Sequence, residues 1–470
     1  MRGAKKSFVF AESMITISGI MKIIIVGAGD VGHYLCQVLS EDGHAVTLIE
    51  SDGERADDAE ENLDVRVIRG NGASAKALST AGVDDCDFLL AMTAFDQLNI
   101  VACAIGKKLG AKTTIARVHD QVYADNSLVN YQKQFGIDIL INPEALTAVE
   151  LAKHVRNPER MAVEDFARGQ IELQEIEVGK GAKAEGVPLR EVKLDSVVKI
   201  GYVQRGEELY VPTADTVLEA GDKITLIGTP DSILKYRGIF SSERSPETVK
   251  IVLNGATETA ISVIRRLSNY RFKIRVIDPD LSRCREIAEQ FPQVTVINGS
   301  ATSLRLLEEE QIGDADYFIA CTKDDEENVM TSLQAKKLGV KYVELVINKP
   351  DYEQVLQNIS GFLNITANAS PRRVSANEIK KYITDKNFAI VGALKGGTVE
   401  FLELKVSPKS AACGQTLRDM PLPPACIIAA IVNDDGAKVP GANDTVNAGD
   451  RIILILEKEH VREAADIFVR

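Results

Sequence analysis

The sequence predicts an α/β protein built from two Rossmann-like parallel-sheet domains, each followed by a small α+β domain. Three observations predict this class. The first is an internal repeat, in which KIIIVGA at residues 22–28 recurs as KIVLNGA at residues 250–256, a shift of 228 residues. The second is a buried-strand pattern that leads into a glycine-rich loop at residues 27–32. The third is a change to short strands separated by Gly and Pro after residue 165.

The repeat extends over the whole length of the chain. DFLLAMT at residues 87–93 matches DYFIACT at 316–322, and the turn AGDK at 220–223 matches AGDR at 448–451. A repeat this regular defines a functional unit of about 228 residues, present in two copies that are held in a fixed relation. Most enzymes need only one such unit, whereas scaffolds, rings and gates often need several.

Charge and composition argue against several classes of function. The net charge of −13 argues against a nucleic-acid or anionic-membrane surface, because both require clustered Lys and Arg. The seven Cys form no CxxC pair and the five His show no metal-ligand spacing. We therefore expect reduced thiols in a cytosolic protein, with no metal site. No apolar stretch reaches the length of about 18 residues that a membrane span requires.

Residues 1–20 lie outside the repeat and are expected to form a disordered N-terminal extension. Lys5 and Lys6 precede a short apolar run that faintly resembles a signal peptide, but Glu12 interrupts the apolar segment. Met21 stands directly before the first predicted strand. We therefore exclude residues 1–20 from the predicted fold.

Residues 21–141 are predicted to form the first nucleotide-binding domain. Six strands of a mostly parallel sheet are predicted at residues 22–26, 45–50, 65–68, 87–92, 113–118 and 138–141. A glycine loop follows the first strand and leads into a helix of amphipathic spacing. This loop consists of Gly27, Ala28, Gly29, Asp30, Val31 and Gly32.

Each glycine of this loop has a physical role in binding a diphosphate. Gly27 permits the tight turn, Gly29 has no side chain to block a pyrophosphate, and Gly32 lets the helix pack close to the strand. The start of the helix then offers free N–H groups and the positive end of its dipole to the phosphates. A bare glycine motif is weak, but strand, loop, helix, strand and acid occur here in the expected order.

An acidic residue ends the second predicted strand. Glu50 lies 23 residues after Gly27, where a carboxylate accepts hydrogen bonds from the adenosine ribose. A carboxylate at this position repels a 2′-phosphate, so the site is predicted to prefer NAD or an adenine nucleotide over NADP. The alternative is an unliganded glycine turn beside a solvated acid.

Three further groups fall at the carboxyl ends of predicted strands, where ligands bind in sheets of this kind. Asn71 and Gly72 follow the third strand and are candidates to face an adenine, while Thr93, Ala94 and Asp96 follow the fourth. Arg117 ends the fifth strand and is a candidate bidentate donor to a phosphate. A loop Asn or Thr is often only a turn residue or a cap, so both roles stay open.

A linker at residues 142–164 contains a predicted helix at 144–155, which carries more apolar surface than one face of a small domain needs. This helix is either a crossover element or subunit contact, or an ordinary capping helix. Residues 165–241 then change to short strands, as at 171–178 and 223–228, and predict a small α+β domain. This domain has no convergent set of His, Cys or carboxylates, which favours packing, dimerisation or ligand sensing over catalysis.

The second copy repeats this organisation with an altered loop. A second Rossmann-like domain is predicted at residues 248–369, a second linker and crossover helix at 370–387, and a second small domain at 388–470. Gly27 is matched by Gly255, but Gly29 becomes Thr257 and Gly32 becomes Ala260. The β-branched Thr257 stands where a pyrophosphate would approach, so the second site is predicted to be weak, altered or vacant. Arg117 also becomes Val346, whereas four polar residues are kept: Glu50 as Asp278, Thr93 as Thr322, Asp96 as Asp325 and Asn99 as Asn328.

Together these motifs resemble the regulatory subunits of Trk-type potassium uptake systems, which carry duplicated RCK (regulator of potassium conductance) units. The resemblance covers residues 21–470 and rests on the glycine loop, Glu50, Thr93 with Asp96 and Asn99, and the two AGD turns. It implies an RCK N-terminal and an RCK C-terminal domain, each present twice. It also implies cytoplasmic, peripheral proteins that form a ring, a homotetramer, beneath a membrane potassium transporter.

The resemblance further implies that NAD(H), ATP or ADP binds the first domain as a regulatory ligand and changes the shape of the ring. The ligand contacts that it implies are Gly27 to Val31, Glu50, Thr93, Ala94 and Arg117, with Asp278, Thr322 and Lys323 in the second copy.

Two alternatives to this function are kept. One is regulation of a different cation transporter or antiporter by the same sensor. The other is an NAD-dependent dehydrogenase, which the fold permits but fold alone does not establish. A dehydrogenase needs an acid–base residue near the nicotinamide, and His119 is the only plausible one. A surface loop is the simpler explanation for His119, and hydride transfer has no use for a duplicated unit. We therefore expect no catalytic residue.

Overall fold

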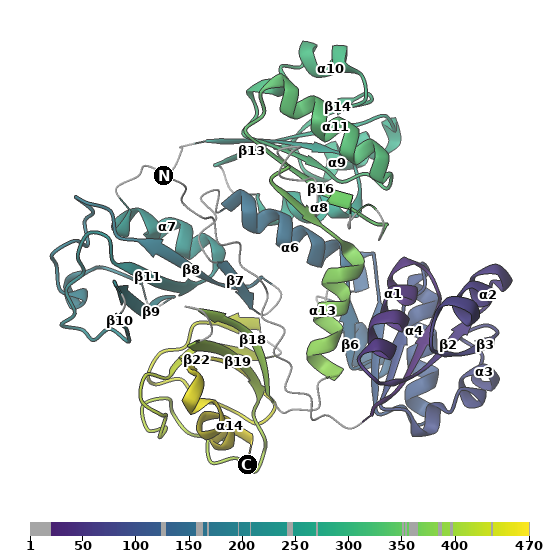
Figure 1. Ribbon diagram of the computed structural model, residues 1–470, viewed down its shortest axis with the longest axis horizontal. Helices are drawn as coiled ribbons and strands as arrows, with labels where there is room; N and C mark the ends of the chain where they lie inside the picture. Colours follow the sequence, from purple (N-terminus) through teal and green to yellow (C-terminus); the bar gives the residue numbers. More distant parts are fainter. Residues whose placement is uncertain are drawn as a thin grey trace.

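The computed structural model describes most of the chain, and it forms four lobes (Figure 1). The described residues are 20–123, 128–156, 163–166, 169–195, 197–206, 208–241, 248–268, 271–349, 352, 355–356, 365–383, 388–394, 398–433 and 436–469. The predicted N-terminal extension, apart from Ile20, lies outside these residues, as do parts of both predicted linkers. None of the helices in the described ranges is both long and apolar enough to cross a membrane.

The first α/β lobe is a six-stranded parallel sheet of order β3-β2-β1-β4-β5-β6, with helices on both faces. This order confirms the predicted Rossmann-like fold, and each strand lies within one residue of its predicted bounds. The elements are β1 (Lys22–Val26), α1 (Asp30–Glu41), β2 (Ala45–Glu50), α2 (Gly53–Asn62), β3 (Arg66–Arg69), α3 (Ala75–Thr80), β4 (Phe88–Ala91), α4 (Asp96–Leu109), β5 (Thr113–Arg117), α5 (Tyr131–Phe135) and β6 (Ile139–Ile141).

The apolar runs form strands because both faces of this sheet are covered. Along β1, Ile23 and Ile25 enter one buried cluster, whereas Ile24 and Val26 enter the cluster on the opposite face. A strand buried on both sides needs continuous apolar residues, which is the pattern seen in the sequence. The charged residues of these strands lie at the strand ends, and the carboxyl ends of β1 to β6 share one edge.

The second α/β lobe repeats this architecture with the strand order β14-β13-β12-β15-β16-β17, and all its neighbouring strands are parallel. The duplication seen in the sequence is therefore a duplication of fold. The elements are β12 (Val249–Asn254), α8 (Glu258–Arg266), β13 (Phe272–Asp278), α9 (Leu281–Gln290), β14 (Thr295–Asn298), α10 (Leu304–Glu309), β15 (Tyr317–Ala320), α11 (Asp325–Leu338), β16 (Tyr342–Val346) and β17 (Ala367–Ala369).

The two small lobes each contain a five-stranded antiparallel sheet, of order β10-β9-β11-β8-β7 and β18-β19-β22-β20-β21. One lobe comprises β7 (Val163–Phe166), β8 (Ile171–Glu177), β9 (Val198–Arg205), β10 (Glu208–Tyr210), β11 (Lys223–Gly228) and α7 (Pro230–Phe240). The other comprises β18 (Phe388–Leu394), β19 (Val399–Lys405), β20 (Ile427–Asn433), β21 (Gly436–Lys438), β22 (Arg451–Glu457) and α14 (Val461–Val469).

The small lobes pack against each other through a shared apolar core. Phe166 and Phe401 meet edge to face at 5.6 Å between ring centroids, and Tyr202 of the first small lobe donates its hydroxyl to the Ala425 carbonyl of the second. Residues of both sheets belong to one buried cluster. The packing role expected for these domains from the sequence is therefore present within one chain.

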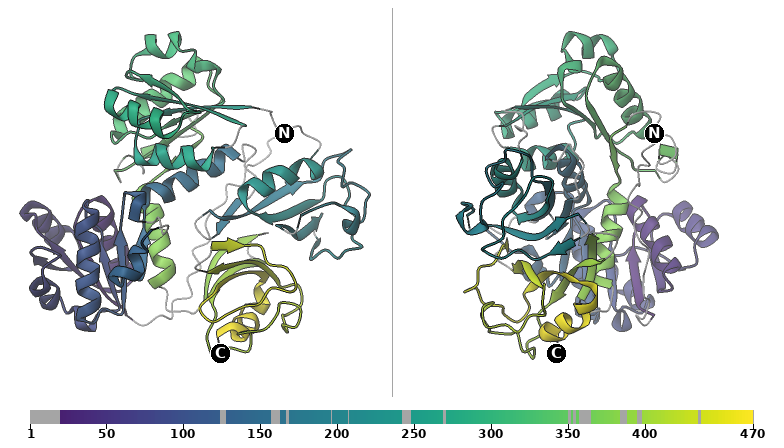
Figure 2. Two further views of the ribbon diagram at one scale, coloured as in Figure 1. Left: turned by 180° about the vertical axis from the view of Figure 1, so that it is seen from behind. Right: turned by 60° about the vertical axis from the view of Figure 1, so that its left-hand side comes forward.

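Two long helices connect the halves by crossing over. Helix α6 (Pro143–Arg156) follows β6, yet its buried residues Leu151 and Val155 belong to the core of the second α/β lobe. Helix α13 (Pro371–Ile383) follows β17, yet Ile379 and Ile383 belong to the core of the first. Both helices run through the centre of the molecule (Figures 1 and 2). The sequence left open whether residues 144–155 cap their own domain or cross over, and they cross over.

Each crossover helix runs side by side with the first helix of the lobe that receives it. The Arg156 guanidinium at the end of α6 donates to the Arg266 carbonyl at the end of α8 and pairs with the buried Glu172 of β8. At the end of α13, Lys380 pairs with Asp42 after α1 at 2.8 Å. Because α1 and α8 begin at the two glycine loops, the crossover helices join each loop region to the opposite half of the chain.

Candidate nucleotide-binding site

The candidate residues of the first copy gather at the carboxyl edge of the first parallel sheet. The glycine loop follows β1, Glu50 ends β2, Asn71 and Gly72 follow β3, and Arg117 ends β5. Thr93, Ala94, Asp96 and Asn99 lie in the β4–α4 connection and the first turn of α4. Parallel strands bring their carboxyl ends to one edge of a sheet, so this convergence follows from the strand order.

The glycine loop has the geometry that the sequence predicted. Gly27 has a φ of +95°, and a Cβ there would lie 2.8 Å from the Thr93 side chain. A Cβ on Gly32 would lie 1.9 Å from the Gly27 carbonyl oxygen, so only glycine lets α1 begin this close to the loop. By contrast, a Cβ on Gly29 would meet nothing within 4 Å. Gly29 therefore borders open space, and that space is where a phosphate can approach.

The start of α1 offers backbone donors without a side-chain cap. Gly29 is the N-cap residue of α1 and, having no side chain, makes no capping hydrogen bond. The first N–H groups of a helix lack partners within the helix and carry the positive end of its dipole. The loop thus presents a site for an anion, beside the exposed Asp30 and the buried Val31.

Glu50 holds the glycine loop to the end of β2. Its buried carboxylate accepts hydrogen bonds from the backbone N–H groups of Ala28, Ser51 (2.6 Å) and Asp52 (2.8 Å). Asp278 repeats this arrangement in the second copy, accepting from Ala256 at 2.7 Å and Asp280 at 2.7 Å. The acid therefore orders the loop in both copies. A ribose hydroxyl that binds Glu50 would donate to a carboxylate that already accepts hydrogen bonds from the backbone.

The loop after β3 is a turn packed tightly on β1. The Asn71 side-chain oxygen accepts a hydrogen bond from the Ala73 backbone N–H at 2.8 Å, and Asn71 is exposed. A Cβ on Gly72 would lie 2.0 Å from Val26, so glycine is required for this loop to lie over the end of β1. Gly72 therefore shapes the edge of the site, and Asn71 has the turn geometry that the sequence analysis kept as its alternative role.

The buried Asn99 side chain holds the β4–α4 connection in place. It is fully buried and its side-chain oxygen accepts from the Thr93 backbone at 2.9 Å and the Thr93 hydroxyl at 2.7 Å. Its amide donates to the Thr93 carbonyl at 3.0 Å and to the Arg117 carbonyl at 2.9 Å. Direct contact between Asn99 and a ligand would break these bonds. The structure assigns it to positioning Thr93 and Arg117, while Ala94 is exposed at the edge.

Asp96 has the same kind of role. It is buried and accepts from the His119 backbone (3.0 Å), the His119 imidazole (2.8 Å) and the Asp120 backbone (3.0 Å). Burial alone would raise the pKa of Asp96, but these hydrogen bonds outweigh it and the pKa is lowered. Asp96 therefore anchors the loop after β5, and His119, the one histidine considered for catalysis, is bound to this acid.

Arg117 pairs with a residue that the sequence analysis did not single out. Its guanidinium donates to the Glu144 carboxylate in the first turn of α6 at 3.2 Å, and both side chains are mostly buried. His119 Nε2 lies 3.7 Å from the same carboxylate. One signal in the sequence points to Glu144: where Arg117 is replaced by Val346 in the second copy, Glu144 is replaced by Arg372.

The second copy caps its own helix. The Thr257 hydroxyl accepts from the Ala260 N–H at 3.3 Å and donates to the Cys321 carbonyl at 2.9 Å. A donor at the start of α8 is thereby satisfied within the chain. Thr322 is held by Asn328 as Thr93 is by Asn99, at 2.8 Å between the side chains, and the neighbouring Lys323 is exposed. The second copy thus keeps the hydrogen bonds that hold its loops. At the position of Gly29, however, Thr257 fills the open space and accepts from one of the first N–H groups of the helix.

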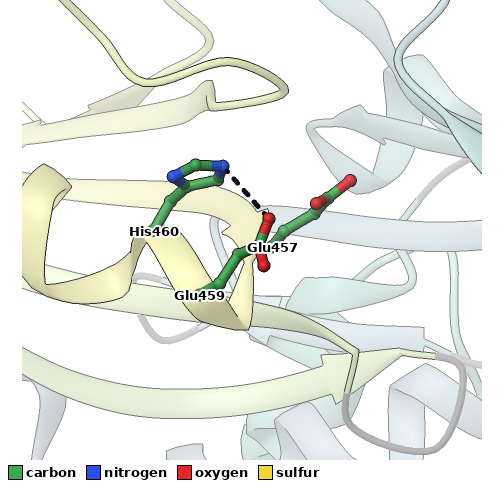
Figure 3. A group of neighbouring side chains, drawn as sticks. All are labelled: Glu457, Glu459 and His460. Carbon is green, nitrogen blue, oxygen red and sulfur yellow. Dashed lines mark ion pairs between the residues drawn. The ribbon is translucent and has the colours of Figure 1, made fainter.

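A separate group of side chains lies at the end of the second small lobe. Glu457, Glu459 and His460 place one ligand atom each within 4.8 Å of one another (Figure 3). His460 Nε2 is 3.5 Å from Glu459 and His460 Nδ1 is 3.2 Å from Glu463. Glu459 is 75% exposed, and His460 lies beside the exposed Glu459 and Glu463 carboxylates. We assign this group no ligand.

The fold and the site define a class of protein in which dinucleotide-type α/β lobes are paired with small α+β lobes and joined by crossover helices. The model of the TrkA-N domain matches residues 23–143 and 251–366, and the model of the TrkA-C domain matches residues 173–241 and 401–469. The chain therefore belongs to the TrkA family, and the duplication of both domains predicted from the sequence is confirmed.

Curated relatives of this family match along nearly their whole length. A "Trk system potassium uptake protein TrkA homolog" of Archaeoglobus fulgidus is 31% identical over 448 residues, covering 95% of this chain and 100% of the relative. Homolog 1 of Methanosarcina mazei is 33% identical over 442 residues, covering 92% and 97%. The "Trk system potassium uptake protein TrkA" of Halomonas elongata is 29% identical over 458 residues, covering 95% and 98%.

Solved structures share the four-lobed fold. The crystal structure of the GsuK RCK domain superposes with a TM-score of 0.59 at 20% identity and covers 96% of both chains. The "GsuK channel bound to NAD" has a TM-score of 0.57 at 20% identity and covers 97% of this chain and 80% of the GsuK chain. At this identity the likeness shows the fold.

Proposed function

We propose that this protein is a cytosolic, nucleotide-sensing regulatory subunit that binds NAD(H), ATP or ADP and gates a membrane potassium-uptake transporter. The names of the curated relatives support the potassium system. Structures of GsuK bound to NAD and to ADP support nucleotides as ligands of this fold. In this proposal the protein is not an enzyme, and the domain boundaries expected from the sequence separate the sensing lobes from the packing lobes.

The observation that carries the proposal is the difference between the two glycine loops. The first has open space at Gly29 and an uncapped helix start, whereas Thr257 caps the helix in the second. The first loop is therefore the proposed ligand site, with Gly27 to Gly32 on the phosphates and Glu50 near the ribose. Thr93, Ala94 and Arg117 complete it. Asp278, Thr322 and Lys323 are proposed contacts of a weaker second site.

A bound nucleotide changes the transporter only if it binds two shapes of the regulator with different affinity. The crossover helices supply the physical link, because α6 begins at the edge of the first site and packs against the second α/β lobe. A triphosphate brings more negative charge toward Glu50 than a dinucleotide does. We therefore propose that ATP, ADP and dinucleotides favour different shapes.

Ring assembly, as a homotetramer, forms part of the proposal. The first α/β lobe exposes large apolar side chains along α4 and the segment after β5, and Gln97 of α4 bonds to Tyr123 of that segment at 3.0 Å. Exposed apolar side chains that gather in one part of a surface are typical of an interface. The exposed residues are Phe95, Val101, Leu109, Val122, Leu128, Val129 and Phe135.

Nucleotide titration of the purified full chain tests this function. We expect calorimetry to show binding of at least one of NAD, NADH, ATP and ADP, and solution scattering to show different shapes for different ligands. Potassium uptake by a strain that lacks the gene should be restored by the wild-type chain. Identical shapes with all four ligands, or no binding at all, would contradict the proposal.

The same experiments separate the alternatives. Restoration of the transport of another cation, without an effect on potassium, would favour regulation of a different transporter or antiporter. Turnover of NADH with small alcohols or acids would favour a dehydrogenase. The bond between His119 and Asp96 and the contact of His119 with Glu144 give that imidazole a structural explanation, so we expect no turnover.

A further inference from the structure

The Arg117–Glu144 ion pair connects the candidate nucleotide site to the crossover helix. Arg117 ends β5 at the edge of the site, and Glu144 stands in the first turn of α6. Their side chains are only 13% and 17% exposed. Among the described residues, Arg117 Nε and Glu144 Oε2 are nevertheless buried without a hydrogen-bond partner. Arg117 Nε can therefore still donate a hydrogen bond, and Glu144 Oε2 can still accept one. A nucleotide phosphate is an acceptor that binds a guanidinium strongly.

The surroundings of Glu144 are acidic and include the second α/β lobe. Helices α6 and α8 lie side by side, with their last residues joined by the hydrogen bond from Arg156 to the Arg266 carbonyl. Glu258, in the first turn of α8, interacts with Asp120 and Glu144 of the first half. Burial raises the pKa of Glu258, and repulsion by Asp120, Glu144 and Glu286 raises it further. The Arg117 guanidinium is the cation that pairs with Glu144 and offsets this repulsion, and His119 Nε2 lies 3.7 Å from the same carboxylate.

We propose that nucleotide binding breaks the Arg117–Glu144 ion pair, and that the released carboxylate then repels the second α/β lobe. This inference rests on the proposed function, because it requires a phosphate at the first site. In the free protein the guanidinium neutralises Glu144 at the start of α6. A phosphate that takes the guanidinium leaves Glu144 facing Asp120 and Glu258, and this repulsion separates the starts of α6 and α8.

The second copy supports a specific role for this pair. By the alignment of the two repeats, Val346 replaces Arg117 and Arg372 replaces Glu144. Arg372 lies over the Tyr34 ring of α1, with 5.1 Å between its guanidinium carbon and the ring centroid. Val346 is apolar, so the second copy has no counterpart of the Arg117–Glu144 ion pair at these two matched positions. The Arg117–Glu144 pair thus occurs in the copy whose glycine loop is open, which is expected if it responds to a ligand.

The test compares the full chain with Glu144→Gln and with the control Glu150→Gln on the same helix. We expect Glu144→Gln to bind NADH or ADP roughly fivefold more tightly, because the competitor for Arg117 loses its charge; this corresponds to about 1 kcal/mol. We also expect the nucleotide-dependent change in amide hydrogen exchange at α8 to disappear. Glu150→Gln should behave like the wild type in both measurements.

Two further results make the test decisive. In Arg117→Gln the nucleotide should bind more weakly, and adding Glu144→Gln to it should change the affinity no further, since the two residues act through one interaction. If the wild type binds nucleotide but Glu144→Gln matches it in affinity and exchange, the coupling is refuted and the proposed function stands. If the wild type binds none of the nucleotides, the proposed function itself fails.

Discussion

At the scale of single residues, the candidate site separates into side chains that leave space for a ligand and side chains that hold the loops. Gly29 leaves open space, whereas Asp96 and Asn99 are buried and bonded to neighbouring loops. The sequence marks Asp96 and Asn99 as candidates as well, because a short polar residue near a strand end has the same pattern in both roles. Only the direction of the side chain distinguishes them, and that depends on the packing of α4 and β5.

Two glycines of one loop should respond to substitution in opposite ways. Gly29→Val places a side chain in open space, so we expect unchanged thermal stability and a loss of nucleotide affinity of more than about tenfold, or about 1.4 kcal/mol. Gly32→Ala forces a methyl group against the Gly27 carbonyl, so we expect a loss of stability of about 1–3 kcal/mol. Calorimetry and thermal unfolding of both variants check this. Retained binding in Gly29→Val would contradict the assignment of the site.

At the scale of secondary structure, the sequence predicts where the elements lie and fails to predict what they pack against. Strands such as β1 and β4 are found within one residue of expectation, because a buried parallel strand needs a continuous apolar run. The apolar residues of α6 show that it is buried. They cannot show that the partner lies more than a hundred residues away, because any apolar surface satisfies the same pattern. The pairing of Arg117 with Glu144 is likewise not predicted, because it depends on where the start of α6 lies beside β5.

Helix α6 also carries an ion pair that makes its docking sensitive to pH. His154 faces the fully buried Glu344 of β16 at 3.7 Å, and its carbonyl accepts from Tyr317 of β15 at 3.2 Å. Glu150 and Lys153 of α6 lie nearby. Burial alone would lower the pKa of His154, but Glu344 and Glu150 outweigh it and the pKa is raised. The stabilisation is therefore complete below the ordinary pKa of about 6.5 and is lost as pH rises through the raised value.

We accordingly expect α6 to exchange its amide hydrogens more readily, relative to the intrinsic rate, at about pH 8 than at about pH 6. His154→Gln should remove most of this pH dependence, because glutamine carries no proton that titrates in the range. His460→Gln is the control, since that partly buried histidine lies beside Glu459 and Glu463 of the second small lobe. A wild-type protein whose α6 is protected equally at both pH values would contradict the role of this pair.

At the scale of the whole molecule, the exchange of α6 and α13 makes the halves depend on each other. Each α/β lobe has its core completed by the helix of the other copy. The small lobes share a further core. The repeat in the sequence predicts two similar units, but it contains no information on how they interlock, because both copies carry the same apolar pattern.

A chain of residues 21–241 alone should therefore not be a stable monomer. Its α6 would expose Leu151 and Val155, and the face of α1 that α13 covers would be open. We expect dimers in analytical ultracentrifugation, formed by α6 of each copy docking on the other, and a one-to-one complex when residues 248–470 are added. The full chain at the same concentration is the control. A monomeric half-chain with unchanged thermal unfolding would show that the exchanged helices contribute little.

The exchanged helices also set the order of events during synthesis. The strands of the first α/β lobe leave the ribosome early, but Ile379 and Ile383 of its core are made roughly 240 residues after Ile141. At typical elongation rates of about 5–20 residues per second, roughly 10–50 seconds pass before helix α13, which completes the core of this lobe, has been synthesised. During that interval the apolar surface that α13 covers in the finished protein is exposed, so we expect the nascent chain to be prone to aggregation until its second half emerges.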